Sequence, residues 1–81
     1  MNVLFLEVTL ERQDQKVIEH LQAIKIQLEA QASCLEARLL QNTQDPNVIL
    51  LESTWTLEMP EVIEGFPLPG LKCRRWSFRL L

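Results

Sequence analysis

Residues 48–57, with the sequence VILLESTWTL, form the run that most limits the folds open to this chain. Aliphatic, β-branched and aromatic side chains dominate it, and their alternation with a period of two is typical of a β-strand. The alternation places Ile49, Leu51, Ser53, Trp55 and Leu57 on one face and Val48, Leu50, Glu52 and Thr54 on the other. We therefore predict a central strand around which the other elements close.

Three further strands are predicted from the same alternation. Residues 2–10 place Leu4, Leu6, Val8 and Leu10 on one fully apolar face. Residues 33–42 form the next strand, and the following Asp45-Pro46-Asn47 is strong turn chemistry, so this strand and the central one form a hairpin. Residues 72–80 form the last strand. In the predicted register Trp76, Phe78 and Leu80 face the core, and Arg75 and Arg79 face the other way.

Two helices are predicted between these strands. Residues 14–31 carry Val17, Leu21, Ile24 and Leu28 at helical spacing, with Asp14 as the N-cap or as an acidic residue of the first turn. A short second helix is predicted over residues 59–64. Pro60 suits its first turn, because a proline lacks the N–H that is unused there, and Gly65 suits its end.

The order of elements predicts an α+β fold. Strand, helix, strand, strand, short helix and strand, joined by right-handed crossovers, give a ferredoxin-like βαββαβ domain. Its four-stranded antiparallel sheet would have the order 4-1-3-2, with both helices on one face. The 81 residues suffice for this one domain, which spans residues 1–81.

The sheet face away from the helices is predicted to be half apolar, which favours burial against a second copy in a homodimer. The same face would carry charged side chains that form a candidate polar cavity. These are Glu7, Glu36, Arg38, Glu52, Arg75 and Arg79. Two interpretations stay open: a salt-bridge network that sets strand register and dimer geometry, or a cavity that holds a small ligand and an acid with a perturbed pKa.

Composition and motifs exclude several classes of function. The net charge of -3 argues against a nucleic-acid-binding surface, and no apolar segment is long enough to cross a membrane. We expect no signal peptide, because the N-terminus lacks a basic n-region. We also expect no metal site and no cofactor, because the chain has neither a metal-ligand spacing nor a phosphate-binding loop. Cys34 and Cys73 are expected to be reduced thiols of a cytoplasmic protein, and His20 a surface or boundary residue.

Residues 33–55, SCLEARLLQNTQDPNVILLESTW, resemble the antibiotic-biosynthesis monooxygenase-like domains. These domains have a strand, an Asp-Pro-Asn-like turn, and an aliphatic run that ends in Glu and Trp. The resemblance implies a dimeric α/β barrel, in which two ferredoxin-like sheets face each other. It also implies that Glu52, Glu7 and Trp55 lie nearest to any chemistry. Here Glu52 and Trp55 are three residues apart, so alternation turns Trp55 toward the helices and Glu52 toward the partner.

Two functions of different class follow from these observations. The first is a dimeric barrel domain that acts as a small-ligand-binding or structural module, with Trp55 as a core residue or as an aromatic wall or interface anchor. The second is a cofactor-independent monooxygenase that acts on a small aromatic or quinol substrate. The sequence leaves the choice between an enzyme and a binding module open.

Overall fold

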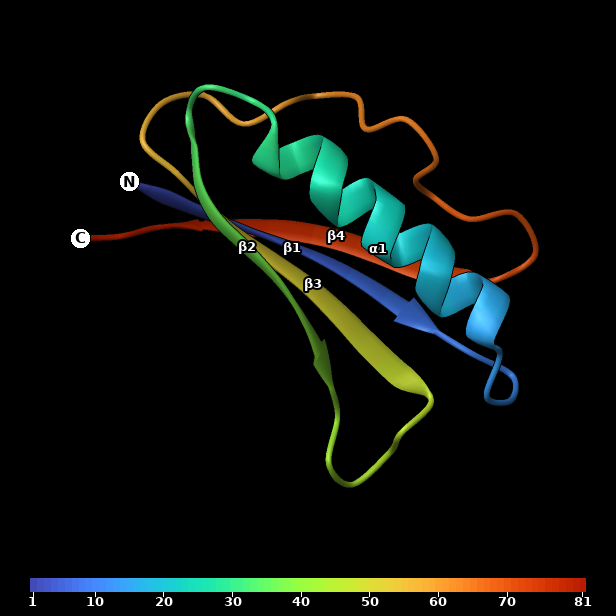
Figure 1. The fold of residues 1–81 in the computed structure, drawn as a ribbon. Coiled ribbons are helices and arrows are strands. Elements are labelled where there is room, and N and C mark those ends of the chain that lie inside the picture. Colours follow the sequence, from blue (N-terminus) through green and yellow to red (C-terminus); the bar gives the residue numbers. More distant parts are fainter.

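The computed structural model describes residues 1–81, and it is an α+β domain with a four-stranded antiparallel sheet and one helix (Figure 1). The elements are β1 (Asn2–Thr9), α1 (Gln15–Glu29), β2 (Cys34–Gln41), β3 (Val48–Trp55) and β4 (Lys72–Arg79). This arrangement is compatible with a ferredoxin-like fold. The predicted strand order is confirmed, since the sheet runs β2-β3-β1-β4.

The hairpin between β2 and β3 turns where the Asp-Pro-Asn sequence predicts it. The Asn42 side chain accepts hydrogen bonds from the backbone N–H groups of Gln44 and Asp45, at 2.8 and 2.9 Å. Asp45 in turn accepts from the backbone N–H of Asn47 at 3.1 Å. These local bonds satisfy the turn backbone and set the register in which Arg38 lies opposite Glu52.

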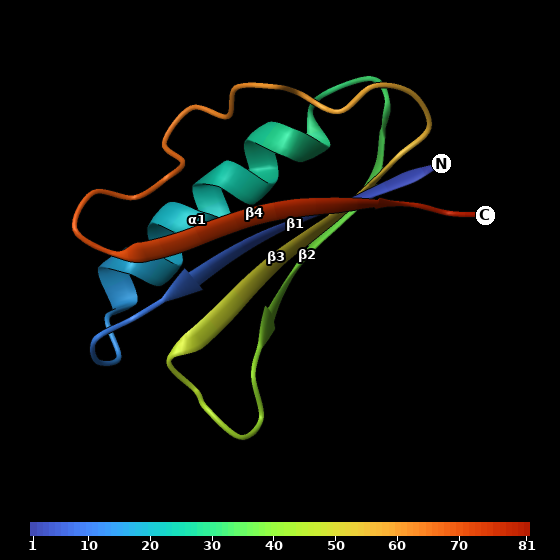
Figure 2. The ribbon, with the colours of Figure 1, turned by 180° about the vertical axis from the view of Figure 1, so that it is seen from behind.

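Helix α1 begins at the predicted cap, because the Asp14 side chain accepts a hydrogen bond from the backbone N–H of Lys16 at 3.0 Å. Its apolar stripe of Leu21, Ile24 and Leu28 is buried against the sheet. The helix packs over β2 and β3 and leaves the β4 side of the sheet to another cover. Figures 1 and 2 show that cover as the long connection from β3 to β4, on the same side of the sheet as α1.

The predicted helix over residues 59–64 does not form. Residues 56–71, which we call the strap, contain only turns, bends and irregular backbone. A six-residue helix has too few hydrogen bonds to offset its nucleation cost, and Pro67 and Pro69 prevent a helix from extending beyond Gly65. The strap instead buries single apolar side chains, Ile63 and Leu68, in the core.

Two side chains hold the strap to the rest of the domain through its backbone carbonyls. His20 on α1 lies 3.0 Å from the carbonyl oxygen of Gly65; since a carbonyl only accepts, Nε2 of His20 carries the proton. Arg75 on β4 donates to the carbonyl oxygen of Glu61 at 2.8 Å and to that of Pro60. Both anchors bind backbone carbonyl oxygens of the strap and none of its side-chain atoms.

The core lies between the sheet and these two covers. The inward side chains of β1 are almost completely buried, and burial of each contributes about 1.5–3 kcal/mol. The core comprises Leu4, Leu6, Val8, Leu10, Leu21, Ile24, Leu28, Ile49, Leu51, Trp55, Ile63 and Leu68. Trp55 has no exposed surface, and its indole N–H donates to the buried hydroxyl of Ser53 at 2.8 Å. The ring of Trp55 therefore lies in the core, on the covered side of the sheet to which alternation assigned it, and forms no aromatic wall or interface.

Ser53→Ala is expected to lower the free energy of unfolding by about 1–3 kcal/mol, because it leaves the buried indole N–H of Trp55 without an acceptor. Urea unfolding measures the change. Ser77→Ala is the matched control: Ser53 and Ser77 lie on either side of Leu4 on adjacent strands, but Ser77 is exposed. Equal effects of the two substitutions would contradict a role for the indole hydrogen bond.

Gly65→Ala is expected to destabilise the domain by about 1–2 kcal/mol from backbone strain alone, because Gly65 has a φ of 85°. A Cβ there would also meet Nε2 of His20 at 3.0 Å, so the total loss should be larger. Gly70→Ala is the control, since Gly70 has a φ of 77° and open space around its Cα. A loss for Gly65→Ala no larger than that for Gly70→Ala would show that the His20 contact carries no cost.

Candidate functional site

The face of the sheet opposite α1 and the strap has no covering element, and we call it the open face (Figure 2). Strand pairing arranges its side chains in rows that cross the strands. The open face comprises Glu36, Arg38 and Leu40 on β2; Val48, Leu50, Glu52 and Thr54 on β3; Val3, Phe5, Glu7 and Thr9 on β1; and Lys72, Arg74, Trp76 and Phe78 on β4.

An aromatic cluster occupies the β1–β4 side of the open face. The ring of Phe5 stacks on Trp76, with centroids 5.6 Å apart and planes 21° from parallel. Phe78 meets Phe5 edge to face, with centroids 5.7 Å apart. The guanidinium of Arg74 lies 4.8 Å from the centroid of the Trp76 ring, within the range of a cation–π interaction. Phe78 remains 59% exposed, so this cluster presents apolar surface to the outside.

Trp76 and Phe78 lie on the open face, so the prediction that they face the helices is wrong. The side chains of β4 alternate between the two faces of the sheet as expected. However, the set that was predicted to face the core faces outward, and the other set faces the core. The inward positions of β4 lie beneath the strap, which already fills this part of the core with Ile63 and Leu68. Small or polar side chains therefore occupy those positions, and the large aromatic rings point outward.

The same inversion removes two arginines from the candidate polar cavity. Arg75 pairs with Leu6 across the strands and reaches the strap carbonyls on the covered side of the sheet. Arg79 follows the same alternation, opposite Asn2. Arg74 takes their position on the open face, although it was not predicted there. Its position directly opposite Glu7 in the strand register identifies it as an open-face residue.

The four remaining predicted residues, Glu7, Glu36, Arg38 and Glu52, all lie on the open face. Nε of Arg38 is 2.8 Å from Oε1 of Glu52, and this hydrogen bond, together with the carboxylate charge, raises the pKa of the Arg38 guanidinium. Nε of Arg74 is 3.5 Å from Oε1 of Glu7. Both carboxylates are paired with guanidinium groups across strands, whereas Glu36 has no ion-pair partner.

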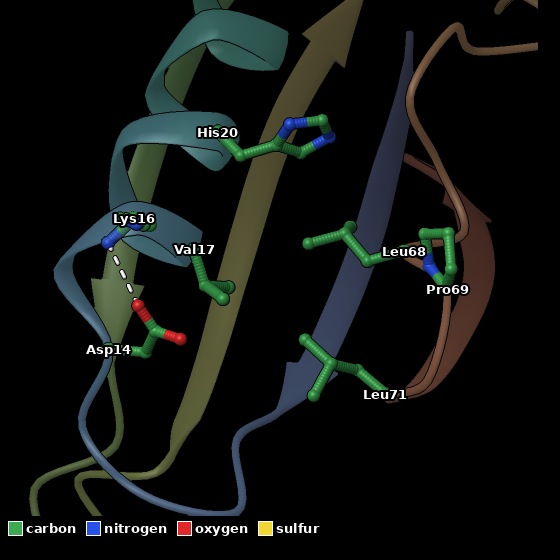
Figure 3. Close-up of a pocket in the computed structure, with 7 residues that line it drawn as sticks. All are labelled: Asp14, Lys16, Val17, His20, Leu68, Pro69 and Leu71. Atoms are coloured by element: carbon green, nitrogen blue, oxygen red, sulfur yellow. Dashed lines mark hydrogen bonds between the residues drawn. The ribbon is translucent and has the colours of Figure 1, made fainter.

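A second candidate is a hollow of about 360 Å³ between α1 and the strap, open to solvent (Figure 3). Figure 3 shows the His20 ring pointing from the helix toward the strap, with Leu68, Pro69 and Leu71 on the far wall. Its size is within the range of small-molecule sites. However, Asp14 caps the helix and His20 holds the strap, so these polar groups already have structural partners.

Neither site contains a cluster of three His, Cys, Asp or Glu residues that could hold a metal ion. No helix has both the length and the apolar character needed to cross a membrane. Cys34 and Cys73 are free thiols on the two outer strands of the sheet. Three strand spacings, about 14 Å, separate these strands, which exceeds the span of a disulfide.

Burial raises the pKa of the Cys34 thiol above its ordinary value of 9.0, and the charge of Glu29 adds to this rise. We therefore expect Cys34 to be a poor nucleophile at neutral pH. In a Cys73→Ser variant, the pH midpoint for alkylation by iodoacetamide should lie higher in the folded chain than in the urea-unfolded chain. The folded state should also lose stability as the pH rises above about 9, where only the unfolded thiol ionises freely. A folded midpoint at or below the unfolded one would contradict this.

No protein-family model matches the chain, and no curated protein matches it significantly. The resemblance of residues 33–55 to the antibiotic-biosynthesis monooxygenase-like domains therefore stays a prediction. The open face, with its aromatic cluster and its two ion pairs, is the feature of this chain on which a functional proposal can rest.

Proposed function

We propose that this chain is a homodimerising structural module, in which two copies bring their open faces together and close a dimeric α/β barrel of the antibiotic-biosynthesis monooxygenase-like type. The single observation that carries the proposal is the aromatic cluster of Phe5, Trp76 and Phe78 on an uncovered sheet face. Aromatic side chains are enriched at protein interfaces because they bury large apolar areas. A second copy supplies an equal aromatic surface.

The size of the open face supports a second copy as the occupant. Four strands about 4.8 Å apart, each eight residues long at about 3.3 Å per residue, span roughly 19 by 26 Å. That is roughly 500 Å² on each copy, or roughly 1,000 Å² in total. This total is at the lower limit for a specific protein–protein interface, about 1,000 Å².

The charges of the open face also support self-association. The whole chain has a net charge of -3, which would repel a copy. The open face carries three acidic side chains, Glu7, Glu36 and Glu52, and three basic ones, Arg38, Lys72 and Arg74. It is therefore neutral at neutral pH, and two such faces approach without net repulsion.

The ion pairs weigh against the alternative of a cofactor-independent monooxygenase at the same face. A carboxylate that removes a proton from a quinol must be free to bind that proton. Glu52 accepts a hydrogen bond from Nε of Arg38 at 2.8 Å, so its Oε1 already has a partner within the chain. Glu7 lies beside Arg74. The two ion pairs are better explained as contacts that set the strand register. They therefore favour a structural module over an enzyme.

Trp76→Glu is expected to raise the dissociation constant of the dimer about thirtyfold or more, because it places a carboxylate in the apolar part of the interface. Sedimentation equilibrium of the wild-type and variant chains measures the constant. Val62→Glu is the control. It makes the same kind of change at an apolar residue of the strap that is 86% exposed, on the covered side of the domain.

The Val62→Glu chain should associate like the wild type, and circular dichroism should show both variants folded. A wild-type chain that sediments as a monomer at every concentration would overturn the proposal. In that case a titration of the monomer with small aromatic compounds, followed by chemical shifts of open-face residues, would show whether the face takes a ligand instead.

A further inference from the structure

The C-terminal part of the chain, residues 60–81, contributes little to the core. It comprises most of the strap together with β4, and we call it the C-terminal unit. Of the 14 buried residues of the domain, only Ile63 and Leu68 belong to it. No residue of β4 is buried, whereas every second residue of β3 is. Because burial of apolar side chains is the main favourable term in folding, this unit is held less strongly than the rest of the domain.

The C-terminal unit also has few polar attachments to the rest of the domain. As an edge strand, β4 pairs with β1 alone, and α1 packs over β2 and β3 instead. The strap forms one backbone hydrogen bond with the rest of the chain, from the N–H of Thr56 to the carbonyl oxygen of Ser33 at 2.9 Å, and Thr56 precedes the unit. The only hydrogen bond between the unit and α1 joins Nε2 of His20 to the carbonyl oxygen of Gly65 at 3.0 Å.

Hydrogen bonds on either side of Met59 mark the point at which the unit begins. The carbonyl oxygen of Glu58 accepts a hydrogen bond from the hydroxyl of Ser33 at 3.4 Å, so the chain before Met59 is held by the loop that leads into β2. The carbonyl oxygen of Glu61 accepts from Arg75 on β4 at 2.8 Å, so the chain after Met59 is held by β4. Rotation of the backbone at Met59 therefore breaks neither contact.

We propose that the C-terminal unit opens and closes as one body about Met59, and that the hydrogen bond between His20 and Gly65 is the latch that favours the closed state. The part that stays folded comprises α1 and the strands β1, β2 and β3, with all but two of the buried residues. The strap and β4 move together because Arg75 binds strap carbonyl oxygens from β4. This opening belongs to a single copy of the chain and does not rest on the proposed dimer.

Opening changes what the open face presents. The aromatic cluster is divided between the two parts, since Phe5 lies on β1, whereas Trp76 and Phe78 lie on β4. Only the closed state therefore carries the complete cluster. A partner that binds the cluster binds the closed state and stabilises it by mass action. The latch on α1 thus controls a surface on the opposite side of the sheet.

Hydrogen exchange of the full chain tests the opening, because β1 contains amides of two kinds. Neighbouring residues of an antiparallel strand direct their backbone groups to opposite sides. The N–H of Leu10 donates to Asn47 on the β3 side, and the carbonyl oxygen of Met1 accepts from Leu80 on the β4 side. The even-numbered amides of β1 therefore donate toward β3, and the odd-numbered ones donate toward β4.

We expect the odd-numbered amides of β1 to share the protection factors of the β4 amides that pair with them, at least about tenfold below those of the even-numbered amides. Both less protected sets should show one common dependence on urea, because a single opening exposes them. Extrapolation to low chain concentration removes any contribution from a bound second copy.

Two results of this measurement would overturn the inference. Equal protection of the odd-numbered and even-numbered amides of β1 would show that the domain opens only as a whole. Protection of β4 that falls gradually toward the C-terminus, without a dependence on urea, would show fraying of the strand end in place of the opening of a unit.

Three substitutions separate the latch from general stability. His20→Ala removes the latch and is expected to lower the protection of the β4 amides about threefold to tenfold, the effect of one hydrogen bond. His20→Gln keeps a side-chain N–H donor and should stay within about twofold of the wild type. Ser53→Ala is the matched control, because Ser53 and its partner Trp55 both belong to the part that stays folded.

Ser53→Ala should lower the protection of the even-numbered β1 amides and leave that of the β4 amides unchanged, because its cost is the same in the closed and the open state. A loss of protection in both sets would show that the two parts unfold together. Unchanged protection of the β4 amides in His20→Ala would show that this contact is not the latch.

Discussion

Burial of the inward side chains of β1 beneath two different covers is the constraint on which the rest of the structure depends. These side chains, Leu4, Leu6 and Val8, belong to β1, which lies between β3 and the edge strand β4. Helix α1 reaches only over β2 and β3. The strap must therefore close the core on the β4 side. It does so with two apolar side chains and with backbone carbonyls that His20 and Arg75 hold. An irregular segment can serve as a cover because its anchors are backbone groups.

This cover determines what β4 presents on each side. Beneath a helix, the inward positions of β4 would face a broad apolar stripe, and Trp76 and Phe78 would suit them. Beneath the strap, the inward Arg75 instead satisfies carbonyl groups that no helix hydrogen bonds occupy. The aromatic rings are consequently on the open face, where Phe5 stacks on one of them. The loss of a helix and the gain of an aromatic interface are thus two results of the same local sequence, with its prolines at 60, 67 and 69.

This link explains what the sequence could and could not predict. Strong alternation in residues 2–10 and 48–57, a capped amphipathic helix and an Asp-Pro-Asn turn were enough to predict the helix α1, the hairpin and the strand order. Glu7, Glu36, Arg38 and Glu52 were placed on the right face because β1, β2 and β3 each have one strongly apolar side. β4 has alternating aromatic and arginine residues, and either phase buries something unfavourable. Which set of β4 side chains faces the core depends on the segment that covers this strand. The local sequence pattern carries no information about that cover, so Arg75 and Arg79 were assigned to the open face in place of Arg74.

The position of the aromatic cluster bears on how this face can be covered. Phe5, Trp76 and Phe78 lie toward one corner of the sheet, and the charged pairs occupy its centre. A copy docked about an axis through the centre, parallel to the strands, would set the aromatic rings of each face against the Glu36 and Arg38 end of the other, where guanidinium and carboxylate groups would lose water without new partners. An axis that passes through the aromatic corner sets Phe5 and Phe78 of each copy against the same residues of the other, but it also sets Glu7 against Glu52.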